Sequence, residues 1–243
     1  MLKPGILVFD IGGSGIKAAV VDEQGNLLSE RLRVPTPHPC LPSVLVDTLV
    51  QLVALCPAYN RISIGFPGAI RNGLILTAAN LDSREWIGFD LPDALSRRMD
   101  NHPARIINDA DLQGFALIRG KGLELVITLG TGFGSALFRD GQLMPHLELA
   151  HHPVADNLTY DQYLGNAALK QINAEVWNER LLRVLDVLEV LLHPDHIVLT
   201  GGNVRLVTVD LPSSVRMAPS DTGISGGAAL WRHQSQGVGD PAR

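Results

Sequence analysis

Two glycine-rich segments lie in matching surroundings, and this repetition constrains the fold more than any other feature of the chain. The first reads DIGGSGIK over residues 10–17, and the second reads TLGTGFG over residues 128–134. Each lies between two apolar runs of strand type and is followed by an acidic turn. Glycine accepts positive φ and lacks a Cβ, so such tips let backbone N–H groups approach an anion closely. The repetition predicts a duplicated fold that holds one polyanionic ligand between its halves.

Length, charge and apolar segments limit the class of protein. With 243 residues, the chain can form one large or two small domains with real cores. Its formal net charge of −5 argues against a general nucleic-acid binder, which would need a basic surface. No apolar segment is long enough to span a bilayer, and no signal peptide precedes the first strand-like run. We therefore expect a soluble cytoplasmic protein with no nucleic-acid or membrane partner.

The hydrophobic pattern predicts an α/β fold in two similar halves. In the first half we expect strands at 5–10, 16–21, 27–34, 62–66 and 104–107 and helices at 43–55 and 91–99. In the second half we expect helices at 110–119 and 162–192 and strands at 123–129, 134–139, 142–144, 197–200 and 215–217. A last helix at about 223–231 and a disordered tail at 234–243 complete the pattern. The domains are expected to cover 1–109 and 110–243, and the last helix is a candidate to return to the first domain.

Phosphoryl transfer is a chemistry that two anion-binding tips would serve. Such an enzyme holds an anionic donor, aims an acceptor hydroxyl and removes its proton, largely by positioning and electrostatics. Lys17 would add positive charge near the phosphates, and Asp10 would hold Mg²⁺ directly or through water. The structural alternatives are a carboxylate that caps the following turn for Asp10 and a solvated strand residue for Lys17.

Asp109 is the candidate general base. It follows the strand at 104–107, and the carboxyl ends of strands are where α/β sheets place their sites. Asn108 beside it can both donate to and accept from a hydroxyl. Asn and Asp are also favoured helix N-caps, so the pair by itself fits a cap equally well.

A second group of polar residues fits sugar recognition. Glu148 and His151 lie three positions apart, and together they can accept from and donate to sugar hydroxyls. His152 follows directly, but one Glu with one or two His is thin support for a metal site. Asn80 is a polar residue in apolar surroundings, for which a plain turn residue is the alternative.

In these motifs the chain resembles the ROK sugar kinases, and most closely their polyphosphate glucokinase-like branch. The resemblance runs over almost the whole chain and rests on residues 10–17, 65–68, 79–82 with Trp86, 108–111, 129–136, 148–151 and 200–202. It implies the actin-like, hexokinase-like fold, in which two RNase H-like domains flank a central cleft. It also implies a homodimer.

The resemblance implies a role for each matching residue. Asp109 is then the catalytic base that takes the proton of the sugar 6-hydroxyl. The sugar-binding residues implied are Asn80, Asn108, Glu148 and His151. The donor-phosphate residues implied are Gly12, Gly13, Ser14, Gly15, Lys17, Gly130, Thr131 and Gly132. Gly201 and Gly202 would meet the nucleoside of a nucleotide donor, with Mg²⁺ as the cofactor.

The chain departs from the family pattern in three ways, one of which is that Ala150 replaces the Gly of the family's Glu-x-Gly-His segment. The cysteine-rich zinc motif that follows the Glu/His segment in most members is absent, and neither Cys40 nor Cys56 lies near it, so no zinc is expected. A family Glu beyond that motif has no clear counterpart. The first hypothesis is a glucokinase-type enzyme whose donor is polyphosphate, ATP or both, and the absent motif together with the GGSGIK form favours polyphosphate. The alternatives are an ATP-dependent kinase for another hexose and a non-catalytic sugar-binding ROK protein.

Overall fold

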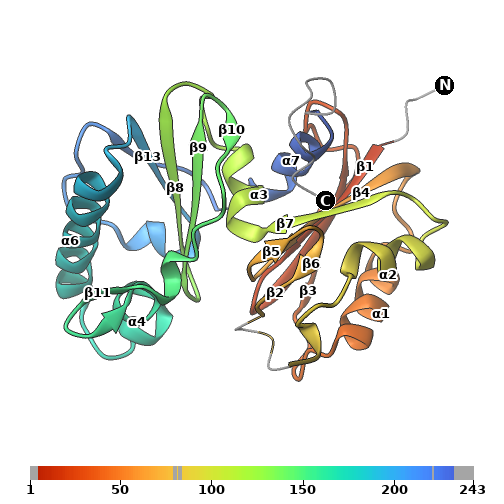
Figure 1. Ribbon diagram of the computed structural model, residues 1–243, viewed down its shortest axis with the longest axis horizontal. Coiled ribbons are helices and arrows are strands. Elements are labelled where there is room, and N and C mark those ends of the chain that lie inside the picture. The colour runs from red at the N-terminus through yellow and green to blue at the C-terminus, as the bar shows by residue number, and fades with distance from the viewer. Residues whose placement is uncertain (1–4, 79–80, 82–83, 221, 233–243) are drawn as a thin grey trace. The chain divides into compact units, whose positions relative to one another are not determined.

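Two five-stranded mixed sheets built to the same plan organise the chain (Figure 1). The computed structural model describes residues 5–78, 81, 84–220 and 222–232. The chain divides into a first unit, Met1–Ala116 with Thr222–Arg243, and a second unit, Leu117–Asp221. In each sheet an antiparallel three-stranded meander is continued by parallel strands, as the repeated glycine-rich segments predict.

The first sheet has the strand order β3-β2-β1-β4-β7. Its strands are β1 (Gly5–Ile11), β2 (Gly15–Val21), β3 (Leu32–Pro35), β4 (Tyr59–Phe66) and β7 (Ala104–Asn108). The strands β1, β4 and β7 run parallel, so their carboxyl ends meet at one edge of the sheet. All seven residues of β1 are buried, because this central strand is covered on both faces.

Helices cover both faces of the first sheet because strand side chains alternate in direction. On one face, Leu7 and Phe9 belong to a core with the residues of α1 (Pro42–Leu52) and α2 (Leu91–Arg98). On the other face, Ile6 and Val8 join Leu112 of α3 (Asp109–Phe115) and Ile224 of α7 (Gly223–Gly226). The remaining elements are η4 (Gly227–Trp231), the β5 (Ile70–Arg71) and β6 (Leu74–Ile75) hairpin, and η1 (Arg84–Trp86).

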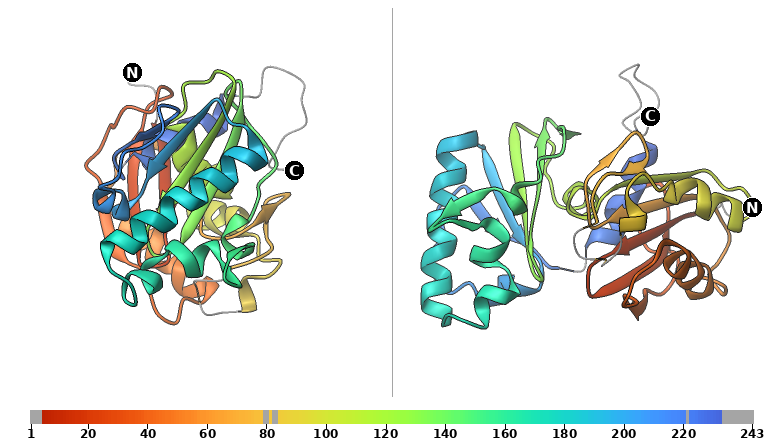
Figure 2. Two further views of the ribbon diagram at one scale, coloured as in Figure 1. Left: turned by 90° about the vertical axis from the view of Figure 1, so that its left-hand side faces the viewer. Right: turned by 60° about the horizontal axis from the view of Figure 1, so that its bottom comes forward.

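The second sheet has the order β10-β9-β8-β13-β14. Its strands are β8 (Leu123–Leu129), β9 (Phe133–Arg139), β10 (Gln142–Leu143), β13 (His196–Thr200) and β14 (Val215–Met217). The 19-residue helix α6 (Ala174–Leu192) lies across one face of this sheet, as the left view of Figure 2 shows. The other elements are η2 (Leu149–His151), β11 (Pro153–Ala155), β12 (Leu158–Thr159), α4 (Tyr160–Leu164), α5 (Asn166–Leu169) and η3 (Gly202–Leu206).

Most predicted strands are confirmed, but the predicted third strand at 27–34 is shorter. Its first part makes only an isolated bridge between Val21 and Leu27, and β3 begins at Leu32. The hydroxyl of Ser29 accepts the backbone N–H of Val20 at 2.9 Å. The Ser29 side chain therefore accepts the backbone N–H of Val20, which a continuous ladder between β2 and the third strand would need for a backbone carbonyl. Asp90 caps α2 by accepting the N–H of Asp93.

The prediction of one helix over 162–192 is wrong. The segment contains the end of α4, the short α5 and the long α6. Gly165 turns the chain with ψ of 174°, which ends α4. Asn173 then caps α6 by accepting the N–H of Val176 at 2.9 Å. The spacing of the apolar residues in this segment did not indicate the breaks at Gly165 and Asn173.

Three other predicted helices end early. The helix expected at 110–119 is α3, which ends at Phe115. The helix expected at 43–55 is α1, which ends at Leu52. Pro57 follows shortly afterwards in the sequence, and a proline and the residue before it disfavour continuation of a helix. The helix expected at 223–231 is α7 followed by the 3-10 turns of η4. Trp231 fastens this segment to the first sheet, since its indole N–H donates to Ser63 Oγ at 2.8 Å. The predicted tail at 234–243 lies outside the described residues.

Candidate active site

The first glycine-rich loop joins β1 to β2 and is closed by hydrogen bonds of its own. The N–H of Gly12 donates to the carbonyl of Gly15 at 2.9 Å. The hydroxyl of Thr36, which is 3% exposed, donates to the carbonyl of Gly12 at 2.6 Å. The N–H of Thr36 also reaches the carbonyl of Ser14 at 3.4 Å. Thr36 therefore clamps the loop from the end of β3, a role that the sequence did not reveal.

A row of charged side chains crosses the first sheet directly beside this loop. Asp10 of β1 is paired with Lys17 of β2, and Lys17 is paired with Arg33 of β3. Directly opposed residues of an antiparallel pair point to the same face, so the three side chains lie in one line. The ammonium of Lys17 is 3.4 Å from Asp10 Oδ2. Asp10 and Lys17 were predicted for the site, whereas Arg33 was not.

Asp10 is a buried carboxylate whose protonation is shaped by its surroundings. Burial raises the pKa of Asp10, while the charge of Lys17 and hydrogen bonds from Lys17 and Gln113 oppose the rise. The residues fit Mg²⁺ only in part, because one carboxylate oxygen is engaged by an ammonium. No three His, Cys, Asp or Glu side chains gather as metal ligands in the described part of the chain. Contact with Mg²⁺ through water suits Asp10 better than direct coordination.

Asn108 and Asp109 begin α3 at the carboxyl end of β7. The side-chain oxygen of Asn108 accepts the N–H groups of Ala110 at 2.8 Å and Asp111 at 3.4 Å. Its amide nitrogen donates to the carbonyl of Gly68 at 3.1 Å. Asn108 is thus the helix N-cap, one of the two roles that its residue type suggested. The carboxylate of Asp109 accepts the N–H of Ala110 at 3.0 Å and stays only half-buried.

Gly65 of β4 lets α3 begin close to the sheet. A Cβ at this position would lie 2.7 Å from Leu112 Cδ2 and 3.3 Å from the Asp109 Cα atom. Both distances are shorter than ordinary carbon–carbon contacts. The FPG segment that follows supplies the carbonyl of Gly68 to Asn108. Together these contacts fix where Asp109 lies. The predicted sugar residue Asn80 lies outside the described residues.

The second glycine-rich loop, between β8 and β9, is held by two polar side chains and one backbone N–H of its own unit. Asn203 donates to the carbonyl of Gly130 at 3.1 Å and to the side-chain oxygen of Asn166 at 2.8 Å. The N–H of Asn166 donates to the carbonyl of Thr131 at 3.1 Å. Asp161 accepts the N–H of Phe133. This loop is therefore a fixed structure rather than a loose turn.

Gly201 begins the turn after β13 and fits only as glycine. Its φ is +98°, and a Cβ there would lie 2.3 Å from the carbonyl oxygen of Leu129. At Gly202, by contrast, a Cβ would meet no atom within 4 Å. The close approach of Gly201 to β8 brings the predicted Gly-Gly turn next to the second glycine-rich loop.

Glu148 precedes η2 and His151 is its last residue, and both belong to one electrostatic cluster with His146 and Asp161. His146 Nε2 is 3.5 Å from Glu148 Oε2. A hydrogen bond from His146 lowers the pKa of Glu148, with the charges of His146 and His151 acting in the same direction against burial. Burial raises the pKa of Asp161, and the charge of Glu148 adds to that rise. The structure therefore brings the predicted pair together and adds Asp161.

Sequence reasoning missed Asp161 because nothing in its local pattern sets it apart. It is the second residue of the short helix α4, where an acidic side chain normally serves the helix itself. Its partner Phe133 lies 28 positions away. The neighbouring His152 is exposed, and its ring faces Tyr160 with centroids 6.2 Å apart.

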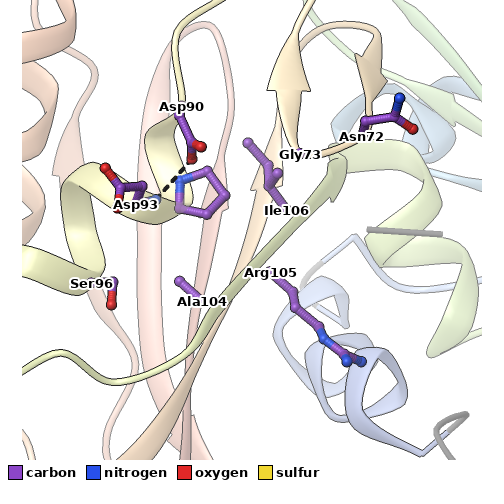
Figure 3. A pocket seen from close by; sticks show the side chains of 9 residues that line it. Asn72, Gly73, Asp90, Asp93, Ser96, Ala104, Arg105 and Ile106 are labelled. Carbon is purple, nitrogen blue, oxygen red and sulfur yellow. Dashed lines mark hydrogen bonds between the residues drawn. The ribbon is translucent and has the colours of Figure 1, made fainter. Parts of the chain in front are cut away.

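A separate hollow in the first unit takes no part in this arrangement. It has a volume of about 280 Å³ and lies between α2, β7 and the β5–β6 hairpin (Figure 3). Arg105 lines it, but its side chain points away from the hollow, and its guanidinium bonds the carbonyl of Leu230. Asp90 and Asp93, which also line it, serve the start of α2.

Comparisons with known proteins agree with the motifs. A model described as the ROK family matches residues 6–157. The polyphosphate glucokinase of Mycobacterium tuberculosis (strain ATCC 25618 / H37Rv) is 32% identical over 203 residues, which cover 79% of this chain and 76% of the relative. No helix in the described part of the chain is both long and apolar enough to cross a membrane.

Solved structures extend the likeness to the fold. The inorganic polyphosphate/ATP-glucomannokinase from Arthrobacter sp. strain KM has a TM-score of 0.83 and 32% identity, covering 93% of this chain and 98% of its own. A ROK family glucokinase from Streptomyces griseus in complex with glucose and AMPPNP has a TM-score of 0.75 and 21% identity, covering 93% and 98%. The latter likeness concerns the fold alone.

Proposed function

The chain belongs to the ROK family, and from that premise we propose that it transfers a phosphoryl group from polyphosphate or ATP to the 6-hydroxyl of glucose. A sugar kinase of the glucokinase type is what its similarity to polyphosphate glucokinases and to a polyphosphate/ATP-glucomannokinase supports. Beyond this activity, we propose which donor the chain uses and which residue carries out each step.

One observation carries the proposal: a candidate base and an anion-binding loop share one edge of one sheet. Asp10 is opposite Gly65 in β4, and Gly65 is opposite Ile107 in β7. The first glycine-rich loop and Asp109 therefore both begin just beyond this line. Two strand spacings separate them, about 10 Å of backbone. That span suits a sugar hydroxyl lying between a carboxylate and a terminal phosphate.

In the proposed reaction, Asp109 accepts the proton of the 6-hydroxyl as its oxygen attacks the terminal phosphorus. The bond to the bridging oxygen of the donor breaks, and the shortened donor leaves. Asn108 holds Asp109 in place through the cap of α3, and its remaining amide N–H is available to the sugar. Glu148 and His151 bind sugar hydroxyls in this proposal. Asp161 interacts electrostatically with both of them.

The glycine-rich loops hold the donor phosphates in this proposal. Mg²⁺, held through water at Asp10, would neutralise part of the donor's charge. The N–H groups of Gly12 and Gly130 bond within their own loops, so phosphate contacts fall to the other backbone groups of the two turns. We also propose a homodimer, supported by the exposed apolar side chains of Val187, Val190 and Leu191 on α6. Light scattering after size-exclusion chromatography gives the mass.

The first experiment measures glucose 6-phosphate formation with Mg²⁺, supplying ATP and long-chain polyphosphate separately. We expect turnover in the wild type and its loss in Asp109→Asn, with glucose binding retained by calorimetry. Mannose is the first rival sugar, because the relative from Arthrobacter is named a glucomannokinase. Near-full activity of Asp109→Asn would refute the assigned base. Absence of turnover across a panel of hexoses with both donors would instead favour a non-catalytic sugar binder.

A further inference from the structure

We propose that Arg33 binds the donor, contacting a phosphate that stays on the donor after transfer. The inference rests on the proposed function, since it requires phosphates at the first glycine-rich loop. Arg33 is the middle of β3, which joins the sheet at its outer edge. It lies outside the glycine-rich motifs, and no motif in the sequence assigns it a role.

The guanidinium of Arg33 lies directly against the loop. A Cβ built on Gly15 would be 3.7 Å from Arg33 Nε and 3.8 Å from Arg33 Nη2. The guanidinium therefore occupies the side of Gly15 on which any other residue would carry its side chain. The backbone arrangement supports this position, because Arg33 is paired with Lys17 and Gly15 with Pro35. A phosphate held by the loop would lie within reach of the planar donor groups.

The charges in this row favour Arg33 over Lys17 as the cation that attracts the donor. The ammonium of Lys17 is 3.4 Å from the carboxylate of Asp10, so much of its charge is already balanced. The side chain of Arg33 is exposed and makes no hydrogen bond or ion pair with any residue in the described part of the chain. The row Asp10, Lys17 and Arg33 thus carries one net positive charge in a protein whose formal net charge is −5.

The chemistry of the side chain suits a phosphate. A guanidinium presents several N–H donors in a plane, stays protonated, and binds two oxygens of one phosphate at once. An exposed arginine without a partner also loses less on binding than one that must first leave a carboxylate. Lysine at the same place would offer a point charge without the planar geometry.

The topology indicates which phosphate Arg33 contacts. Strand β3 and strand β7 are the two outer strands of the first sheet, four spacings or about 19 Å apart. Asp109, the proposed base, follows β7, so the reacting phosphorus lies toward that side. Arg33 lies on the opposite side of the glycine-rich loop. It therefore meets the part of the donor that leaves and not the phosphoryl group that is transferred.

Binding of inorganic tripolyphosphate, measured by calorimetry with Mg²⁺ present, tests the proposal without relying on turnover. We expect Arg33→Gln to weaken binding by roughly ten-fold, the loss of one charge-assisted contact. Arg33→Lys is expected to fall between Arg33→Gln and the wild type. The matched control is Arg97→Gln on α2, which removes the same charge from the opposite face of the same sheet. It should bind like the wild type.

Kinetics with polyphosphate provide the second readout. Arg33→Gln should raise the KM for the donor while kcat and the KM for glucose stay within about two-fold. The inference is overturned if Arg33→Gln binds tripolyphosphate as the wild type does, if Arg97→Gln loses as much, or if kcat falls while the donor KM is unchanged. A wild type that neither binds tripolyphosphate nor phosphorylates a hexose would overturn the proposed function, and the inference with it.

Discussion

The carboxylate of Asp161 accepts the backbone N–H of Phe133, and the glycine beside that phenylalanine makes room for it. A Cβ on Gly132 would lie 2.4 Å from Asp161 Oδ1. The shape of the second glycine-rich loop therefore depends on an acidic side chain as well as on its glycines. The same carboxylate interacts electrostatically with Glu148 and His151, so the loop and the proposed sugar-binding residues form one network.

This network predicts opposite pH responses for its two carboxylates. The pKa of Asp161 is raised by burial, so its contribution to stability is present below its ordinary pKa and lost as pH rises through the folded value. The pKa of Glu148 is lowered by His146, so its contribution is present above its ordinary pKa and lost as pH falls through the folded value.

Melting temperature measured against pH checks this pair. Relative to the wild type, Asp161→Asn should lose stability mainly at the acid end and least at neutral pH. Glu148→Gln should lose most at neutral pH and least in acid. Parallel curves for the two variants would contradict the assigned causes of the shifts.

Replacing Thr36 should loosen the first glycine-rich loop. Thr36→Val keeps the shape of the side chain but leaves the carbonyl of Gly12 without the hydroxyl that now donates to it. We expect a loss of about 1 kcal/mol in the free energy of unfolding and a several-fold rise in the donor KM. Urea denaturation and steady-state kinetics measure the two effects. Thr48→Val, which loses an exposed bond within α1, is the control and should leave the donor KM unchanged.

Asn108 offers a way to separate capping from sugar binding. Asn108→Ala removes the cap of α3 and should cost about 1–2 kcal/mol of stability, with a fall in kcat because Asp109 begins the same helix. Asn108→Asp keeps an oxygen for the N–H of Ala110 but cannot donate to Gly68, so it should be the more stable of the two. A glucose KM that rises equally in both variants would point to a direct sugar contact. An unchanged KM in Asn108→Asp would point to the cap alone.

Gly165 separates α4 from α5 and should not tolerate a side chain. A Cβ there would lie 2.6 Å from the carbonyl oxygen of Asp161 and 3.0 Å from that of Thr131. Gly165→Ala should lower stability by about 1–3 kcal/mol and disturb the second glycine-rich loop. Gly202→Ala is the control for stability, because a Cβ there meets no atom within 4 Å. Equal melting temperatures for Gly165→Ala and the wild type would be evidence against this tight approach.

Local patterns predicted the elements well where burial follows a simple period. The strand β8 was predicted with both of its ends, and β1 and β2 to within one residue at either end. The failures occur where a side chain competes with the main chain. Ser29 accepts the N–H of Val20, so β3 begins later than predicted. Gly165 and Asn173 divide a segment whose apolar spacing alone predicts one helix.

The same division holds for the candidate site. Residue type and position at or just after the end of a strand were enough to propose Asp10, Asp109 and the two glycine-rich loops as parts of the site. They left open whether Asn108 caps a helix, because the cap depends on where the main chain turns and not on composition. Asp161 and Thr36 were missed, since each acts on a loop that is distant in the sequence.

The sequence by itself determined the duplicated order of strands and the two glycine-rich turns, because the alternation of apolar residues and runs of glycine are local properties of the chain. Only the tertiary structure decided which side chains surround those turns. The pairing of Lys17 with Arg33 depends on strand register, and the contact between Asp161 and Phe133 depends on how α4 packs. Strand register and helix packing depend on the whole core. The fold therefore decides which charged side chains lie beside each loop, and the glycine-rich motifs alone do not.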